Sequence, residues 1–215
     1  MDLHTAALAM AYLGSALGVA MVAPQILRIV RHPRLPGVSV WRWSITVVAC
    51  SLWLTYGVRS GSMPQIPGNV LLISGAAAIV LLVPAAWGRR RRALALAAVT
   101  TAGLVASSWL SPQQVGFLAF AIGITGMWPQ VYETVWRRRG LGPSSLSLTS
   151  TGLGLVSQLL WLTFAVLTLD IPVVVAAVVA ISTNTVITLV EASRRRTPFG
   201  STPLEADLVP EPACA

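Results

Sequence analysis

The sequence predicts an all-α membrane protein of seven transmembrane helices, arranged as two parallel three-helix repeats joined by one inverting helix. Apolar residues make up 55% of the 215-residue chain and charged residues only 10%. The mean hydropathy is +0.74, whereas a soluble domain usually carries about a quarter charged residues. The apolar residues form long runs between Pro, Gly and Arg, and two stretches of the chain repeat the same motifs.

Seven apolar runs are long enough to cross a bilayer, which takes about 20 mostly apolar residues in a helix. Helices are expected because backbone groups in hydrocarbon must pair within their own segment. The predicted spans are residues 5–30, 40–58, 64–87, 93–110, 112–136, 146–169 and 171–192.

The two ends of the chain are interpreted differently. The run 5–30 is too long for a signal-peptide core and its first Arg is Arg28, so we expect a retained helix. The segment 193–215 turns to Pro, Thr, Glu and Asp after Arg196, and this composition predicts a disordered cytoplasmic tail.

Positive charge predicts the orientation. The formal net charge is +8, and all 15 basic residues are Arg. They occur in bursts between apolar runs rather than along a polar face, which argues against nucleic acid as a partner. Cytoplasmic loops carry the Arg excess, so we expect a multi-pass protein of the cell membrane with its N-terminus outside and its C-terminus in the cytoplasm. Apart from Arg59, the Arg residues fall on one side: Arg28, Arg31, Arg34, Arg42, Arg89–Arg92, Arg137–Arg139 and Arg194–Arg196.

Two motifs occur twice. Residues 53–58 (WLTYGV) match residues 161–166 (WLTFAV). A Pro-Gln pair at residues 24–25 matches one at residues 129–130, so the motifs follow each other in the same order in both copies. The interval between the two motifs is slightly longer in the second copy. Three extra residues in a loop account for the difference, and loop insertions cost little.

The repeats are predicted to be parallel, because both begin on the outside. The first covers residues 5–87 and the second residues 112–192. A unit of three helices ends on the side opposite its start, so a second parallel copy needs one additional crossing, and the span 93–110 supplies it.

At these motifs the chain resembles the PQ-loop superfamily and, within it, the SWEET and SemiSWEET sugar facilitators. The resemblance covers about residues 5–192, and its spacing agrees with its motifs. The intervals from Pro24 to Ser39, from Pro24 to Trp53 and from Trp53 to Asn69 are those of the bacterial half-transporters.

The resemblance implies a solute pocket between two three-helix bundles, lined by Trp53, Asn69 and Trp161. The matching Asn of the second half is replaced by Ala177, and Asn184, two helical turns further along, is expected to take its place. Two alternatives remain open: Trp53 could belong to an interfacial aromatic belt, and Asn69 could hydrogen-bond a neighbouring helix.

Pro24 and Pro129 are expected to kink their helices near the cytoplasmic end, since Pro lacks an N–H and clashes with the preceding turn. Gln25 and Gln130 can pair the released backbone groups. The same feature in both halves favours a hinge for an inner gate, and a static kink is the alternative.

An outer gate is also expected, because the family typically places a Tyr, an Arg and an Asp at the outer edge of each half. The first half has Tyr56 and Arg59 but Ser62 in place of the Asp. The second half has Asp170 but Phe164 in place of the Tyr. We therefore predict that Arg59 and Asp170 pair across the outer mouth when it closes, and two solvated loop charges are the alternative.

An enzyme is not expected. His4 and His32 fall on opposite sides of the membrane without a nucleophile or metal partner, and Cys50 and Cys214 form neither a disulfide framework nor a metal site. No cofactor or metal is predicted.

The leading hypothesis for function is facilitative transport of a small sugar by alternating access. No acidic residue falls in mid-membrane, which favours downhill movement over proton coupling. The alternatives are a PQ-loop carrier of an amino acid or other small metabolite, and a non-transporting receptor on the same scaffold. The expected partners are a small-molecule solute and membrane lipid, with a homo-oligomer left open.

Overall fold

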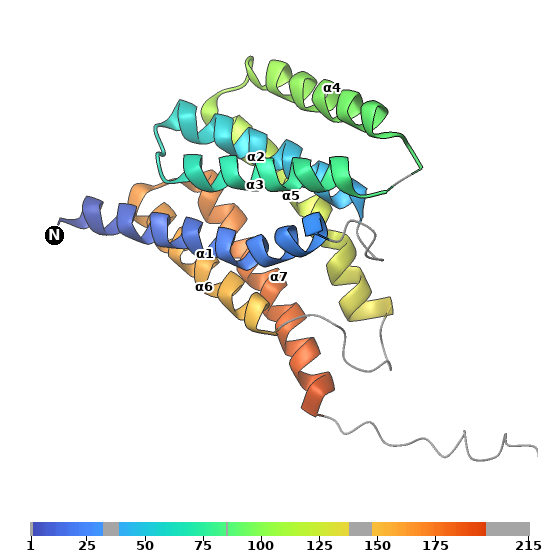
Figure 1. The fold of residues 1–215 in the computed structure, drawn as a ribbon. Coiled ribbons are helices and arrows are strands. Elements are labelled where there is room, and N and C mark those ends of the chain that lie inside the picture. Colours follow the sequence, from blue (N-terminus) through green and yellow to red (C-terminus); the bar gives the residue numbers. More distant parts are fainter. Residues whose placement is uncertain (1, 32–38, 85, 138–147, 197–215) are drawn as a thin grey trace, which may run out of the picture.

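A computed structural model describes residues 2–31, 39–84, 86–137 and 148–196, and this part of the chain is helical without a strand (Figure 1). The all-α prediction is confirmed. The helices are α1 (Leu3–Arg31), α2 (Val40–Ser60), α3 (Gln65–Leu82), α4 (Arg89–Ser107), α5 (Pro112–Tyr132) with the π-helix η1 (Glu133–Arg137), α6 (Leu148–Thr168) and α7 (Ile171–Arg196). The segments 32–38, 138–147 and 197–215, including most of the predicted tail, lie outside the described residues.

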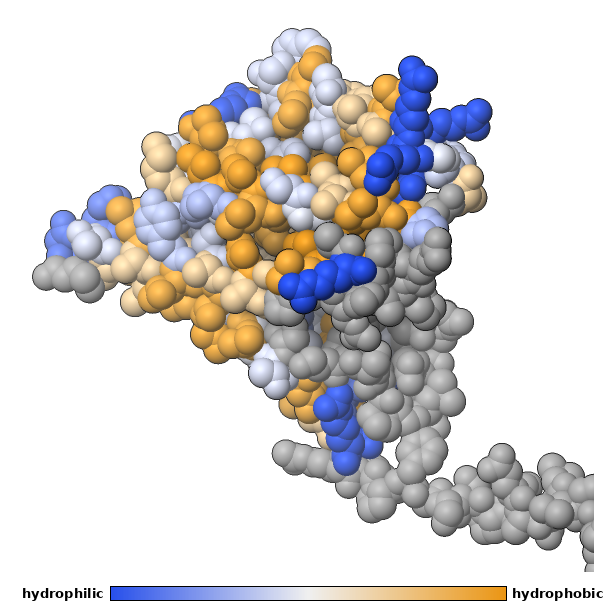
Figure 2. Space-filling view, in the orientation of Figure 1, coloured by the Kyte–Doolittle hydropathy of each residue, from blue (hydrophilic) through white to orange (hydrophobic). Residues whose placement is uncertain are grey.

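The described helices are those of a multi-pass membrane protein. Five of them are long and apolar enough to cross a membrane: α1, α3, α5 continued by η1, α6 and α7. Apolar side chains cover much of the visible surface, and strongly hydrophilic ones lie mainly toward the end away from the N-terminus (Figure 2). Such a surface suits lipid as its solvent, because apolar groups gain nothing from water.

The remaining two helices, α2 and α4, are not among these five. Arg42 and Arg59 lie within α2, and α4 begins with the run Arg89–Arg92. The helix α4 therefore starts four residues before the predicted span 93–110. The predicted span begins where Arg no longer has to enter hydrocarbon, whereas backbone hydrogen bonds continue through the Arg residues.

Local sequence signals set several helix ends. The Asp2 carboxylate accepts a hydrogen bond from the Thr5 N–H at 2.8 Å and caps α1. Ser111 and Gln114 bond each other reciprocally around Pro112, the first residue of α5. This capping box with Pro at the first helical position satisfies backbone donors that have no partner inside the helix.

Six helices form a closed ring. α1 packs on α3 and α6, α2 packs on α3 and α5, and α7 packs on α5 and α6. The order around the ring is α1, α3, α2, α5, α7, α6. This order has twofold symmetry, because it stays the same when α1 is exchanged with α5, α2 with α6 and α3 with α7. α4 lies outside the ring against α2 and α3 (Figure 1). The chain is thus a 3+1+3 assembly of two three-helix units and one linking helix.

The turns that follow α2 and α6 have the same geometry. The Ser62 N–H and the Asp170 N–H each bond the carbonyl five residues earlier at 2.8 Å. The residue before each has a left-handed backbone, with φ of 73° at Gly61 and 56° at Leu169. These two residues are separated by the same interval as the repeated WLTYGV and WLTFAV motifs. The two copies therefore coincide in backbone geometry as well as in motif.

The two ends of the ring are packed differently. We call the end with Arg31, Arg89 and Arg194 the arginine-rich end, and the end with the α2–α3 and α6–α7 turns the arginine-poor end. A buried cluster around Trp43 and Ile79 packs α1, α2 and α3 together toward the arginine-rich end. Other buried clusters join helices of the two halves toward the arginine-poor end.

Two clusters make that connection between the halves. One includes Tyr56 of α2, Val115 of α5, Ala165 of α6 and Val173 of α7. The other packs Phe164 of α6 between turns of α1. The two halves are therefore packed together at the arginine-poor end.

Candidate functional site

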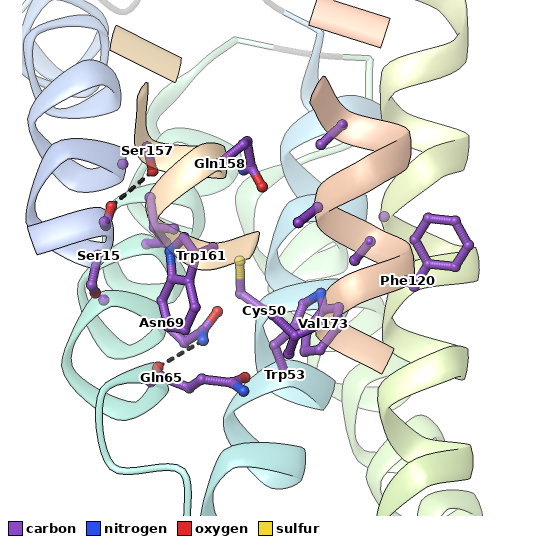
Figure 3. A pocket seen from close by; sticks show the side chains of 18 of the residues that line it. Ser15, Cys50, Trp53, Gln65, Asn69, Phe120, Ser157, Gln158, Trp161 and Val173 are labelled. Carbon is purple, nitrogen blue, oxygen red and sulfur yellow. Dashed lines mark hydrogen bonds between the residues drawn. The ribbon is translucent and has the colours of Figure 1, made fainter. Parts of the chain in front are cut away.

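A cavity of about 300 Å³ lies at the centre of the ring and is lined by residues of all six ring helices (Figure 3). Ligand pockets span about 300–1,000 Å³, so this one suits a small molecule. None of the described residues that line it is charged. The described part of the chain also contains no group of His, Cys, Asp and Glu side chains that could hold a metal ion.

Two tryptophans of the cavity are held in the same way in each half. Trp53 packs edge-on against Tyr56 with ring centroids 5.7 Å apart. Trp161 packs edge-on against Phe164, also at 5.7 Å. Both tryptophans line the cavity, as the sequence analysis expects of them. An aromatic ring fixed by its neighbour presents a preformed apolar face and an N–H donor to a ligand.

The amides of the cavity are not distributed as the sequence suggests. Asn69 lines the cavity and donates through Nδ2 to the Gln65 carbonyl of its own helix at 2.7 Å. Its Oδ1 has no partner among the described residues. The matching residue of the second half, Ala177, also lines the cavity. Asn184 does not; its Nδ2 lies near Gly154, where an added Cβ would be 4.0 Å away.

The displacement of Asn184 has a simple cause. Seven residues of helix restore the same face but advance about 10 Å along the axis. Asn184 therefore points in the expected direction at the wrong depth.

Gln158 supplies a third amide beside those of Asn69 and Gln65, and sequence reasoning missed both glutamines. Gln158 lies on α6 one turn before Trp161, lines the cavity and has no hydrogen-bond partner among the described residues (Figure 3). The signal was present in the repeat. Gln158 is the counterpart of Cys50, and both lie three residues before the repeated Trp, on the same helical face.

The arginine-poor end of the cavity is closed by contacts between the halves. The Tyr56 hydroxyl donates to Asp170 Oδ1 at 2.5 Å, and the Val173 N–H bonds the same oxygen at 3.3 Å. Burial raises the pKa of the Asp170 carboxyl above its ordinary value, although both hydrogen bonds oppose the shift. A Cβ on Gly116 of α5 would come within 3.2 Å of the Tyr56 ring of α2, so helices of the two halves are in close contact there.

The predicted pairing of Arg59 with Asp170 is wrong for this structure. Arg59 donates instead to the Ser107 carbonyl at 2.8 Å and the Leu110 carbonyl at 2.6 Å. Ser107 is the last residue of α4, where the helix dipole favours a cation, and Leu110 lies three residues beyond it. Asp170 is already bound by Tyr56, so each of the two charges has a different partner.

The predicted hinge is only partly described. The backbone of α1 is helical through residues 24–25, but the side chains of Pro24, Gln25 and Gln130 lie outside the described part. Pro129 lies within α5, which changes to the π-helix η1 after Tyr132. Short π-helical segments are frequent at functional sites. The hinge itself stays a prediction.

Comparison with known proteins adds no family. Neither the protein-family models nor the curated proteins include a match to this chain. The resemblance to PQ-loop proteins therefore depends on the repeated motifs and their spacing.

Proposed function

We propose that the protein is a facilitative transporter of a small sugar that works by alternating access between its two three-helix bundles. The observation that carries this proposal is the central cavity, enclosed by the two halves and lined by two tryptophans and by amides without any charged residue among those described. An indole face packs on the C–H face of a sugar, while an amide both donates to and accepts from its hydroxyls.

The uncharged lining argues against the amino-acid alternative. A zwitterion in this cavity would bring two charges out of water, at a cost of several kcal/mol for each ion that lacks a partner. The described lining offers no such partner. A neutral polyol has no charge to compensate and needs only hydrogen bonds.

The contacts at the arginine-poor end support alternating access. Tyr56 and Asp170 belong to different halves, and their hydrogen bond closes that end of the cavity. Opening it requires separating the halves there. We propose that the arginine-rich end is cytoplasmic, because cytoplasmic loops carry the Arg excess, and that the protein resides in the cell membrane.

Uptake by liposomes that contain the purified protein tests the function. We expect labelled sugar, but not labelled neutral amino acid, to equilibrate across the membrane. Trp53→Ala and Trp161→Ala should each reduce uptake more than about tenfold, because the lost stacking is worth at least about 1.4 kcal/mol. Trp109→Ala is the control, since Trp109 is exposed and does not line the cavity.

The outcomes separate the alternatives. Amino-acid uptake without sugar uptake would support the carrier alternative. Saturable binding without any uptake would support a receptor.

Cysteine labelling in intact cells tests the orientation. Cysteines introduced at Ser62 and Ser111 should react with an impermeant thiol reagent, and one introduced at Ser201 should react only after lysis. Labelling at Ser201 in intact cells would reverse the proposed orientation.

A further inference from the structure

The cavity has two chemically different walls. The helices α3, α1 and α6 are neighbours in the ring and contribute its polar side chains: Ser15, Gln65, Asn69, Ser157 and Gln158. The helices α5 and α7 are also neighbours, and none of their described lining residues has a polar side chain. We call these the polar wall (α1, α3, α6) and the apolar wall (α5, α7). Figure 3 shows Ser15, Ser157 and Asn69 toward one side of the cavity, and Phe120 and Val173 toward the other.

This separation departs from the symmetry of the scaffold. α5 and α7 are the counterparts of α1 and α3, and three polar residues of α1 and α3 have apolar counterparts. These pairs are Ser15 with Phe120, Gln65 with Val173, and Asn69 with Ala177.

Most unused hydrogen-bonding groups of the cavity side chains also lie on the polar wall; the indole N–H of Trp53, on α2 between the two walls, is the exception among the described residues. Ser157 donates to the Gly14 carbonyl at 2.8 Å, and Gln65 donates to the Ser62 hydroxyl at 3.3 Å. Asn69 Oδ1 and the whole Gln158 amide remain without a partner among the described residues. A ligand therefore meets an acceptor on α3 and both a donor and an acceptor on α6.

A hydroxyl group directed at the apolar wall would find no partner. Burying an unpaired hydroxyl is unfavourable, and the described side chains of α5 and α7 cannot compensate. A C–H or methyl group at the same place would gain from the contact.

We infer that the solute is amphipathic: a neutral sugar-like molecule with hydroxyls along one edge and an apolar opposite edge, such as a deoxy sugar. This inference rests on the proposed transport function and narrows its substrate class. Gln158 and Asn69 bind the hydroxylated edge, and α5 and α7 contact the deoxygenated one.

Equilibrium binding of D-glucose and its four monodeoxy analogues (2-, 3-, 4- and 6-deoxy) tests the inference. Binding is followed by tryptophan fluorescence of the full-length protein in detergent. We expect at least one analogue to bind about tenfold more tightly than D-glucose, equivalent to about 1.4 kcal/mol. Removal of hydroxyls that face the polar wall should instead weaken binding.

Substitutions in the two walls test whether the apolar wall causes the preference for a monodeoxy analogue over D-glucose. Ala177→Asn introduces an amide into the apolar wall and should bring the preferred analogue and D-glucose within about twofold of each other. Ala177→Leu, an apolar side chain with the same branching as Asn, should retain the preference. Phe120→Ser provides a second polar substitution in case Ala177→Asn fails to fold, which size-exclusion chromatography reveals. Gln158→Met, of similar length, should weaken binding of both sugars.

The outcomes distinguish this inference from the proposed function. If D-glucose and all four analogues bind within twofold of one another, the inference is wrong and sugar transport still stands. The same conclusion follows if the preference survives both polar substitutions. If none of these sugars binds while the protein transports another kind of solute, the proposed sugar function is wrong, and this inference fails with it.

Discussion

At the arginine-poor end, the two halves of the molecule carry different polar groups at matching positions. The first half has Tyr56 where the second has Phe164, and the second has Asp170 where the first has Ser62. Tyr56 and Asp170 meet across the boundary between the halves. One hydroxyl and one carboxylate, each supplied once, make the contact.

The cavity shows the same division. The first half supplies Asn69 and Cys50, and the second half has Ala177 and Gln158 at those positions. By contrast, both halves keep the tryptophan and the turn that follows its helix. Residues that shape a three-helix unit are needed in each copy, because each copy must fold. A group that faces the shared axis is needed only once, so either copy can supply it.

The largest expected effect is a difference in sugar uptake between variants of two amides, Asn69 in the first half and Asn184 in the second. Asn69→Ala should reduce sugar uptake more than about tenfold, because a sugar hydroxyl loses its partner in the cavity and an unpaired polar group costs about 1–3 kcal/mol. Asn184→Ala should change uptake less than about twofold, since Asn184 does not line the cavity. If both variants lost the same share of uptake, the depth of Asn184 along α7 would not be the reason that it is excluded from the site.

The next prediction concerns the contact between the halves. Tyr56→Phe places the second-half residue in the first half and removes the hydrogen bond to Asp170. Hydrogen bonds to charged groups contribute about 1.5–3 kcal/mol, so opening at this end should become about tenfold more frequent. In a Cys214→Ser background, labelling of Cys50 by an impermeant thiol reagent applied at the arginine-poor side measures that opening.

Tyr12→Phe is the control for this experiment, because it removes an exposed tyrosine hydroxyl that does not bond Asp170. An unchanged labelling rate in Tyr56→Phe would mean that the packing of the ring at position 56 against Gly116, rather than the hydrogen bond, keeps this end closed.

A smaller effect is expected from pH. Burial raises the Asp170 pKa in the closed state, so this state binds a proton more tightly than a state with Asp170 in water. The resulting stabilisation of the closed end is complete below the ordinary Asp pKa of about 4 and is lost as the pH rises through the raised value. Cys50 labelling should therefore increase several-fold across this window. Asp170→Asn corrects for the reagent's own pH dependence, and an identical profile in that variant would contradict the prediction.

The smallest effect compares the two matching turns. Leu169 has a left-handed backbone that costs a residue with a side chain about 1–2 kcal/mol, whereas its counterpart Gly61 avoids this cost. Leu169→Gly should raise the free energy of unfolding by up to about 1 kcal/mol, which would appear as a slightly higher melting temperature in detergent. Gly61→Leu should lower the melting temperature. Shifts in the same direction would show that side-chain packing, rather than backbone strain, dominates at these turns.

The sequence was sufficient where a signal was local or repeated. Apolar runs predicted the helices, and the resemblance to the PQ-loop superfamily implied cavity positions for Trp53, Trp161 and Asn69, all of which line the cavity. It was insufficient where a residue depended on its depth or on a distant neighbour. Asn184 shares the face of Ala177 but not its depth.

Long-range partners were the other source of error. The partner of Arg59 is the end of α4, and this proximity arises only when α4 packs on α2 and α3. Gln158 could have been found by comparing the two copies position by position, because the residue one turn before each repeated Trp faces the same cavity. The π-helix η1 has no comparable signal in the residues around it.

If the halves rock as proposed, the bond between Arg59 and the end of α4 makes the two moving bodies unequal. Arg59 ties the Ser107 and Leu110 carbonyls to α2, so four helices form one body and three form the other. The next residue, Ser111, already caps α5. If the halves rock as proposed, the covalent link at this end must flex within the short step from Leu110 to Ser111. A proline or a disulfide placed there would slow the exchange between conformations without touching the cavity.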